Sequence, residues 1–89
     1  MIQTTTTICN QLGLHARASA TLTKLAGSFP CEVWMVRNGR RINAKSIMGV
    51  MMLAAGLGAE VLIETDGEQE NEAMQALLAL IADKFDEGA

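Results

Sequence analysis

The chain contains a single histidine, His15, and its position favours phosphate chemistry. His15 follows a glycine-containing loop, residues 11–14, and precedes a stretch with helical spacing that begins at about Ala16. The first backbone N–H groups of a helix have no acceptor within the helix, so together with the helix dipole they form a site for phosphate. The same positive end disfavours the imidazolium, which leaves a ring nitrogen free to attack phosphorus.

Arg17 lies two residues after His15 and brings a second group to the same helix end. Its forked guanidinium can lie beside a transferred phosphoryl group and balance the charge that develops on it. The backbone N–H groups of Ala16 and Arg17 are the expected phosphate ligands. An alternative stays open at this point, because a lone histidine near a helix start is more often a solvated surface residue or a cap.

Ser46 is the second residue whose position suggests a role. It precedes a short apolar stretch, residues 47–53, which is followed by Gly56 and Gly58. As the N-cap of a short helix, a serine contributes about 1 kcal/mol, and that role alone would account for it. A phosphoserine at the same place is tolerated by the helix end and changes the charge that a partner meets. The residues by themselves favour the cap.

The same short helix carries four large apolar side chains: Ile47, Met48, Met51 and Met52. Core packing is their usual explanation, and some of the four must be core. A helix of fewer than three turns cannot bury every face, however, and flexible thioether side chains suit a surface that serves several partners. We therefore expect Met48 and Met51 to belong to an exposed docking patch.

The pattern along the chain predicts four strands and three helices in the order β-α-β-β-α-β-α. The strands are expected at residues 2–10, 31–37, 40–43 and 59–65, with Asn38-Gly39 as a hairpin turn. The helices are expected from about residue 16 to the Gly27-Ser28 stop, over residues 47–53, and from residue 68 along an apolar face that reaches Phe85. These elements fit a two-layer α+β sandwich in a single domain over residues 1–89, with the helices on one face of the sheet.

Charge is distributed unevenly along the 89 residues, although the net charge is only −3. Residues 1–45 hold six basic side chains against Glu32 alone, a net +5, whereas residues 46–89 hold nine acids against Lys84 alone, a net −8. The basic half contains His15 and suits an acidic partner or a phosphate, although a chance segregation of solvated charges gives the same pattern. The acidic total disfavours nucleic-acid binding.

Several other classes of protein are disfavoured. No apolar run approaches the roughly 18 residues that cross a bilayer, and the N-terminus does not resemble a signal peptide, so we expect a cytoplasmic protein without membrane insertion. A disulfide between Cys9 and Cys31 is an alternative to two reduced cysteines on strands, which we prefer. No cofactor and no metal site is expected, because no cluster of suitable ligands stands out.

Two segments resemble motifs of the HPr family, the histidine-containing phosphocarriers of the bacterial phosphoenolpyruvate-dependent phosphotransferase system. Gly13-Leu14-His15-Ala16-Arg17 resembles the active-site loop of the family, and residues 43–51, which include Ser46, are similar to its regulatory-serine motif. Both motifs occur at the spacing and distance from the N-terminus that the family shows. The resemblance covers essentially the whole chain.

The resemblance implies a function and a topology. His15 would accept phosphate on Nδ1 from enzyme I and donate it to enzyme IIA domains of sugar permeases. Ser46 would be the target of an HPr serine kinase/phosphorylase. The phosphate on Ser46 would repel an acidic partner if the short helix lies near His15. The protein would be a monomeric carrier and not a complete enzyme, and its antiparallel sheet would have the order 1-4-2-3. The partner-binding residues are expected to be Lys24, Lys45, Ile47, Met48 and Met51.

Two alternatives remain beside this interpretation. A nitrogen-regulatory paralogue would use the same His15 chemistry with other donors and acceptors, although the motif around Ser46 favours the carbon branch. A non-catalytic module that binds a small ligand could have a similar α+β fold, and His15 and Arg17 would then be incidental.

Overall fold

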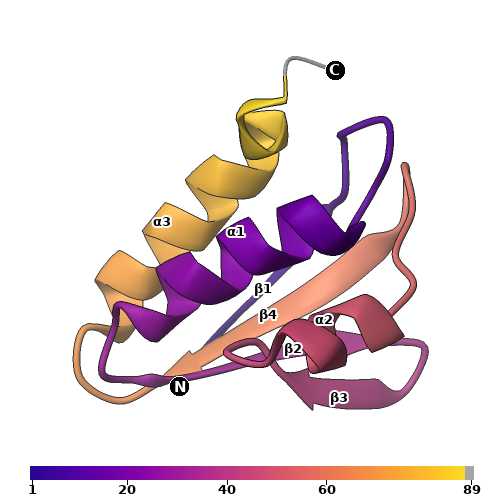
Figure 1. Cartoon of the computed structure of the whole chain (residues 1–89). Coiled ribbons are helices and arrows are strands. Elements are labelled where there is room, and N and C mark those ends of the chain that lie inside the picture. Colours follow the sequence, from indigo (N-terminus) through magenta and orange to yellow (C-terminus); the bar gives the residue numbers. More distant parts are fainter. Residues whose placement is uncertain (88–89) are drawn as a thin grey trace.

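The computed structural model describes residues 1–87 and confirms the predicted order of elements (Figure 1). Four strands are present in the described chain: β1 (Ile2–Thr7), β2 (Glu32–Arg37), β3 (Arg40–Asn43) and β4 (Glu60–Asp66). The helices are α1 (Ala16–Gly27), α2 (Ile47–Met52), α3 (Glu70–Ala82) and a 3-10 turn, η1 (Lys84–Asp86). None of the helices in residues 1–87 is long and apolar enough to cross a membrane.

The strands form one antiparallel sheet in the order β1-β4-β2-β3, as expected. β4 is central and pairs with β1 from Ile2↔Thr65 to Thr7↔Glu60. The β2–β3 hairpin closes at Asn38 and Gly39, whose φ angles of 51° and 78° are the positive values that this type of tight turn requires.

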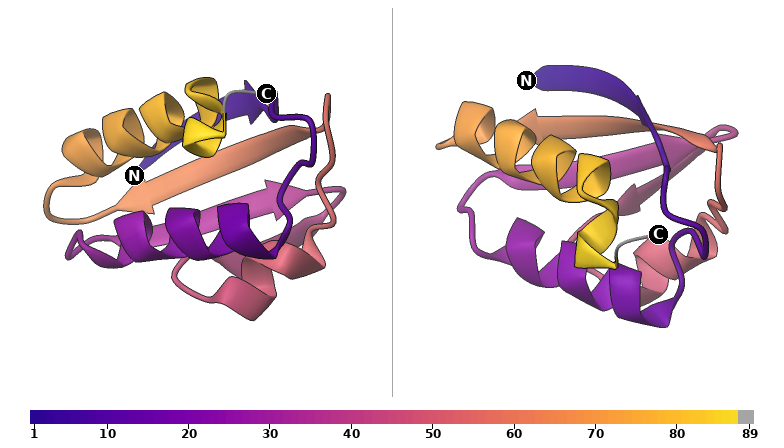
Figure 2. Two further views of the ribbon diagram at one scale, coloured as in Figure 1. Left: turned by 45° about the horizontal axis from the view of Figure 1, so that its top comes forward. Right: turned by 90° about the horizontal axis from the view of Figure 1, so that it is seen from above.

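The helices cover one face of the sheet and the other face is open, so the fold is the predicted open-faced sandwich (Figure 2). Alternation along β4 directs Val61, Ile63 and Thr65 into the core, where all three are buried. Helices α1 and α3 supply apolar side chains to the same core, among them Leu22, Ala26, Met74, Leu77 and Ile81. The core thus consists mainly of aliphatic residues and methionine.

The structure corrects several predicted boundaries. β1 ends at Thr7 and not at residue 10, because Asn10 is buried and its amide folds the chain into the next loop with a 2.8 Å hydrogen bond to Gly13 O. α3 begins at Glu70 and not at residue 68, since Gln69 has a left-handed φ of 65°. Phe85 packs into the core as expected, but from η1 and not from α3.

Cys9 and Cys31 are both free thiols, as preferred, but neither lies on a strand. Cys9 follows β1 and Cys31 precedes β2.

A polar cluster lies on the open face of the sheet. The Glu64 carboxylate accepts hydrogen bonds from Arg41 Nε at 2.7 Å and from Gln3 Nε2 at 2.6 Å. The Arg41 guanidinium lies 4.2 Å from the centre of the Trp34 ring. The hydrogen bond from Arg41, followed by that from Gln3, lowers the pKa of Glu64 below its ordinary value of 4.5. The cluster therefore links all four strands on the face that no helix covers.

Candidate functional site

His15 is the N-cap of α1 and has an extended backbone, with φ −73° and ψ 179°. Its carbonyl oxygen accepts the first hydrogen bond of the helix, from Ser19 N at 2.8 Å. The N–H groups of Ala16 and Arg17 precede that bond and have no acceptor within the helix. The His15 side chain is 28% exposed, so the ring is accessible while one side of it is held by the protein.

The loop before His15 is fixed by three hydrogen bonds. Asn10 Nδ2 donates to Gly13 O at 2.8 Å, Ser19 Oγ donates to Leu14 O at 3.1 Å, and Leu14 N donates to Ala55 O at 2.8 Å. The last of these joins the loop to the segment that follows α2. These contacts hold the start of α1, and with it His15, in one place.

Gly13 is required by the close approach of these two segments. Its φ of +68° is left-handed, and a Cβ atom at this position would lie 2.6 Å from Ala55 O and 2.7 Å from Gly56 Cα. Both neighbours are backbone atoms, which cannot rotate away. The glycine in the predicted motif therefore lets the loop lie directly against the segment after α2.

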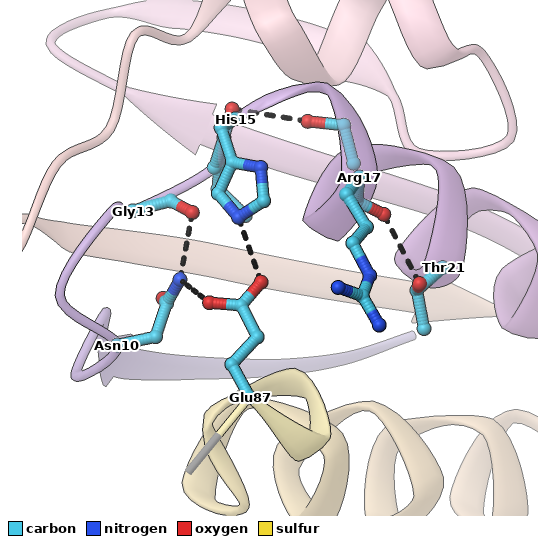
Figure 3. Close-up of polar contacts among 8 residues, drawn as sticks. Asn10, Gly13, His15, Arg17, Thr21 and Glu87 are labelled. Atoms are coloured by element: carbon cyan, nitrogen blue, oxygen red, sulfur yellow. Dashed lines mark hydrogen bonds and ion pairs between the residues drawn. The ribbon is translucent and has the colours of Figure 1, made fainter. Parts of the chain in front are cut away.

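Glu87 belongs to the site, although no pattern in the sequence predicted a role for it. Its Oε2 lies 2.7 Å from His15 Nε2, and its Oε1 accepts a 3.0 Å hydrogen bond from Asn10 Nδ2 (Figure 3). The hydrogen bond from Asn10, with smaller contributions from His15 and the charge of Arg17, lowers the pKa of Glu87 below its ordinary value of 4.5. Since 72 residues separate His15 from Glu87, only the tertiary fold brings them together.

The site surrounds an open hollow of about 340 Å³ at the start of α1, lined by Gln11, Leu12, His15, Arg17, Asp86 and Glu87. Arg17 is exposed. Its side chain extends from the first turn of α1 toward the side on which Glu87 lies (Figure 3). The second ring nitrogen of His15, Nδ1, is on the side of the ring that faces Arg17 and away from Glu87. His15, Arg17 and the backbone N–H groups of Ala16 and Arg17 thus all lie at the N-terminal end of α1. Residues 1–87 contain no group of His, Cys, Asp and Glu side chains that could hold a metal ion.

Apart from Arg17, the basic residues of the N-terminal half are not gathered around His15. Lys24 lies in the last turn of α1, nine residues and so about 13 Å along the helix from His15. Lys45 Nζ donates to Phe29 O at 2.8 Å, just beyond the same end of α1. The net +5 of the first half is therefore not a basic surface at the site.

The three remaining arginines are also placed elsewhere. Arg37 and Arg40 donate to Leu53 O at 2.9 Å and Met52 O at 3.0 Å, which satisfies carbonyl groups at the C-terminal end of α2. Arg41 is on the open face of the sheet with Glu64. The dispersal shows that proximity in sequence did not predict proximity in space for these charges.

Ser46 caps α2 as predicted: its Oγ accepts a hydrogen bond from Gly49 N at 3.1 Å. The two ends of α2 contact different parts of the molecule. Ala55, after the C-terminal end, contacts the His15 loop, whereas Lys45, before the N-terminal end, contacts Phe29 beyond the other end of α1. Ser46 is therefore separated from the His15 loop by the length of α2, about 9 Å.

The prediction that some of the four large apolar residues of α2 belong to the core is wrong. Ile47, Met48, Met51 and Met52 are all exposed, by 40% to 72% of their surface, and Val50 and Leu53 take the core positions instead. We call these four residues the methionine surface. Leu12, which lines the His15 hollow, and Leu57 are also exposed, by 71% and 62%, and the sequence did not single them out.

Comparison with known proteins places this fold and site in a class. Residues 2–83 match a family described as the phosphorylation site of the HPr component of the phosphotransferase system (PTS). The chain is 68% identical over 88 residues to the phosphocarrier protein HPr of Cupriavidus necator, covering 99% of each protein. It is also 40% identical over 83 residues to the phosphocarrier protein NPr of Shewanella violacea, covering 93% of this chain and 91% of that one.

Solved structures agree with this class. The chain superimposes on HPr-C-His of Thermoanaerobacter tengcongensis with a TM-score of 0.95 and 40% identity, covering 98% of each chain. A dimer of HPr from the same organism matches with a TM-score of 0.77 over 96% of this chain and 98% of that one. The fold and sequence are thus those of a phosphocarrier, and the chain belongs to the HPr family of the PTS.

Proposed function

We propose that this chain is a cytoplasmic carrier that accepts a phosphoryl group on His15 from enzyme I and donates it to enzyme IIA domains of the sugar PTS. The observation that carries the proposal is the position of His15, half-exposed at the N-terminus of α1 in a chain of the HPr family. A partner's active site would complete the reaction, since the hollow at His15 is open. We therefore regard the chain as a single-domain substrate of two enzymes and not as an enzyme.

The groups around His15 have distinct tasks in the proposed transfer. The Nδ1 lone pair attacks phosphorus while the bond between phosphorus and the donor breaks, and the electron pair of that bond stays with the donor. The N–H groups of Ala16 and Arg17 bind the phosphoryl oxygens at the helix N-terminus. The Arg17 guanidinium balances the charge of the group as it is transferred.

The methionine surface is the proposed docking surface, with Met48 and Met51 at its centre. Exposed, flexible apolar side chains suit a carrier that must dock on a donor and on several acceptors in turn. Lys24 lies in the last turn of α1, and Lys45 contacts Phe29 just beyond that end. Because this is the end opposite to His15, the two lysines would contact only a partner that extends along the helix. A monomer suits this exchange of partners.

Ser46 is the proposed regulatory site, phosphorylated by an HPr serine kinase/phosphorylase. Its phosphate would not meet His15 directly, because α2 lies between them. It would instead add negative charge beside Ile47 and Met48, at the edge of the methionine surface.

The nitrogen-regulatory branch is the second candidate, supported by the 40% identity to NPr of Shewanella violacea. It shares the chemistry at His15 and differs only in donor and acceptor. The motif around Ser46 and the 68% identity to HPr of Cupriavidus necator support the sugar branch. A module that only binds a small ligand is the remaining alternative.

The test is incubation with enzyme I and labelled phosphoenolpyruvate, followed by addition of an enzyme IIA domain. We expect an acid-labile, base-stable label that His15→Ala abolishes and that moves to enzyme IIA. Label accepted only from the nitrogen-branch enzyme I would identify the second candidate. Absence of label with either enzyme I would reject both carrier functions.

A further inference from the structure

Glu87 holds His15 from the side opposite to the proposed reaction. One carboxylate oxygen faces His15 Nε2 at 2.7 Å, and the other accepts from Asn10 Nδ2 at 3.0 Å. Asn10 is fully buried, and the same Nδ2 also donates to Gly13 O. The Glu87 side chain is itself only 12% exposed. A buried amide that is part of the His15 loop therefore aims this carboxylate at the ring (Figure 3).

The position of the hydrogen on His15 follows from the charge of its neighbour. The pKa of Glu87 is lowered by the hydrogen bond from Asn10 and by His15 and Arg17, so the carboxylate is ionised at neutral pH and can only accept. A neutral imidazole has one N–H group, and a ring nitrogen that faces an ionised carboxylate must be the one that carries it. The other charged groups at the hollow are Arg17 and Asp86. Nδ1 is then the nitrogen with the free lone pair.

We infer that Glu87 is a positioning residue, which holds His15 as the Nε2–H tautomer and partners the positive charge that the ring acquires when Nδ1 is phosphorylated. The second half of this inference rests on the proposed function. With phosphorus on Nδ1 and hydrogen on Nε2, the ring is cationic and faces the Glu87 carboxylate. When the N–P bond breaks, its electron pair returns to Nδ1 and the ring is neutral again. The proton on Nε2 stays in place throughout.

The first test uses the unphosphorylated protein. We would measure the ¹⁵N chemical shifts of the His15 ring at a pH at which the ring is neutral, in the wild type and in Glu87→Ala and Glu87→Gln. Loss of a charge-assisted hydrogen bond at a partly exposed site should raise the ratio of Nδ1–H to Nε2–H tautomer about fivefold in Glu87→Ala. Glu87→Gln should have a smaller effect than Glu87→Ala, because its amide oxygen can still accept from Nε2, although without the charge and the second oxygen of the carboxylate. An unchanged ratio in both variants would overturn the inference.

Glu72→Gln is the matched control, since Glu72 is exposed in the first turn of α3, at the far end of that helix from Glu87. It should leave the tautomer ratio unchanged. If Glu72→Gln changes the ratio as much as Glu87→Ala, general charge and not contact is responsible, and the inference fails.

The second test uses the protein phosphorylated by enzyme I. The phosphorylated ring should lose its Nε2 proton at lower pH in Glu87→Ala and Glu87→Gln than in the wild type, because the cation has lost its partner. Equal titration curves would reject the charge-partner role. If no enzyme I phosphorylates the wild type, the proposed function and this charge-partner role fail together, whereas the tautomer ratio of the free protein still decides the first half.

Discussion

Two side chains of opposite charge, Glu87 and Arg17, lie near the His15 ring (Figure 3). Glu87 is paired with Nε2, and Nδ1 is on the side of the ring away from Glu87 (Figure 3). A carboxylate at the reacting nitrogen would repel an incoming phosphoryl group, whereas a nearby guanidinium attracts it. The arrangement therefore leaves one nitrogen suited to accept phosphate.

Arg17 can be tested by truncation. We expect Arg17→Ala to slow phosphoryl transfer from enzyme I about tenfold to hundredfold, because the developing charge on the phosphoryl group loses its cation. Rapid-quench measurements of phosphoryl transfer from labelled phosphoenolpyruvate would give the rates. Lys24→Ala is the control, as it removes a cation from the other end of the same helix. Equal slowing by both variants would contradict a local role for Arg17.

At the scale of secondary structure, the short helix α2 connects the two regions of proposed function. Its N-terminal end is capped by Ser46, and the segment after its C-terminal end binds the loop that carries His15. Its exposed face between these ends is the methionine surface.

Substitutions at Ser46 can separate its role as a helix cap from the effect of a negative charge at this position. Asp and Asn are both good N-caps, so Ser46→Asp and Ser46→Asn should fold with wild-type stability, whereas Ser46→Ala should lose about 1 kcal/mol of unfolding free energy in urea. Only Ser46→Asp should slow phosphate acceptance from enzyme I, because only that variant adds negative charge near the docking surface. Equal rates for Asp and Asn would leave Ser46 as a cap alone.

A substitution at Gly13 tests the contact between the His15 loop and the segment after α2. Gly13→Ala should destabilise the protein by about 1–3 kcal/mol, because the new Cβ meets Ala55 O at 2.6 Å in a left-handed backbone. Displacement of the loop should also slow phosphate acceptance. Gly56→Ala is the matched control, since the Cβ that it adds has no described atom within 4 Å beyond residues 55–57. A Gly13→Ala variant as stable as Gly56→Ala would contradict the close approach.

At the scale of the whole molecule, the open face of the sheet contributes a pH-dependent stability through Glu64. Its pKa is lowered in the folded state by Arg41 and then by Gln3, so the contribution is present above the unfolded value of 4.5 and is lost as the pH falls through the lower folded value. Glu64→Gln should therefore lose less unfolding free energy than the wild type between about pH 5 and pH 3. Urea titrations across this pH range would measure the unfolding free energy of both proteins. Equal losses in the wild type and in Glu64→Gln would contradict a contribution from Glu64.

Local patterns predicted much of this molecule. The Asn38-Gly39 turn, the Ser46 cap and the loop before His15 depend on residues a few positions apart, and all three form as expected. The contact of Glu87 with His15 and the dispersal of the basic side chains depend on how distant segments pack, and no local pattern contains that information.

His15 is proposed to carry the phosphoryl group on Nδ1 at the start of α1. Nuclear magnetic resonance of the ¹⁵N-labelled protein after phosphorylation by enzyme I tests it most directly, because coupling to ³¹P identifies the bonded nitrogen. We predict coupling at Nδ1 of His15 and none at Nε2, which faces Glu87 in the free protein. Phosphorus bonded to Nε2, or to a residue other than His15, would contradict the account.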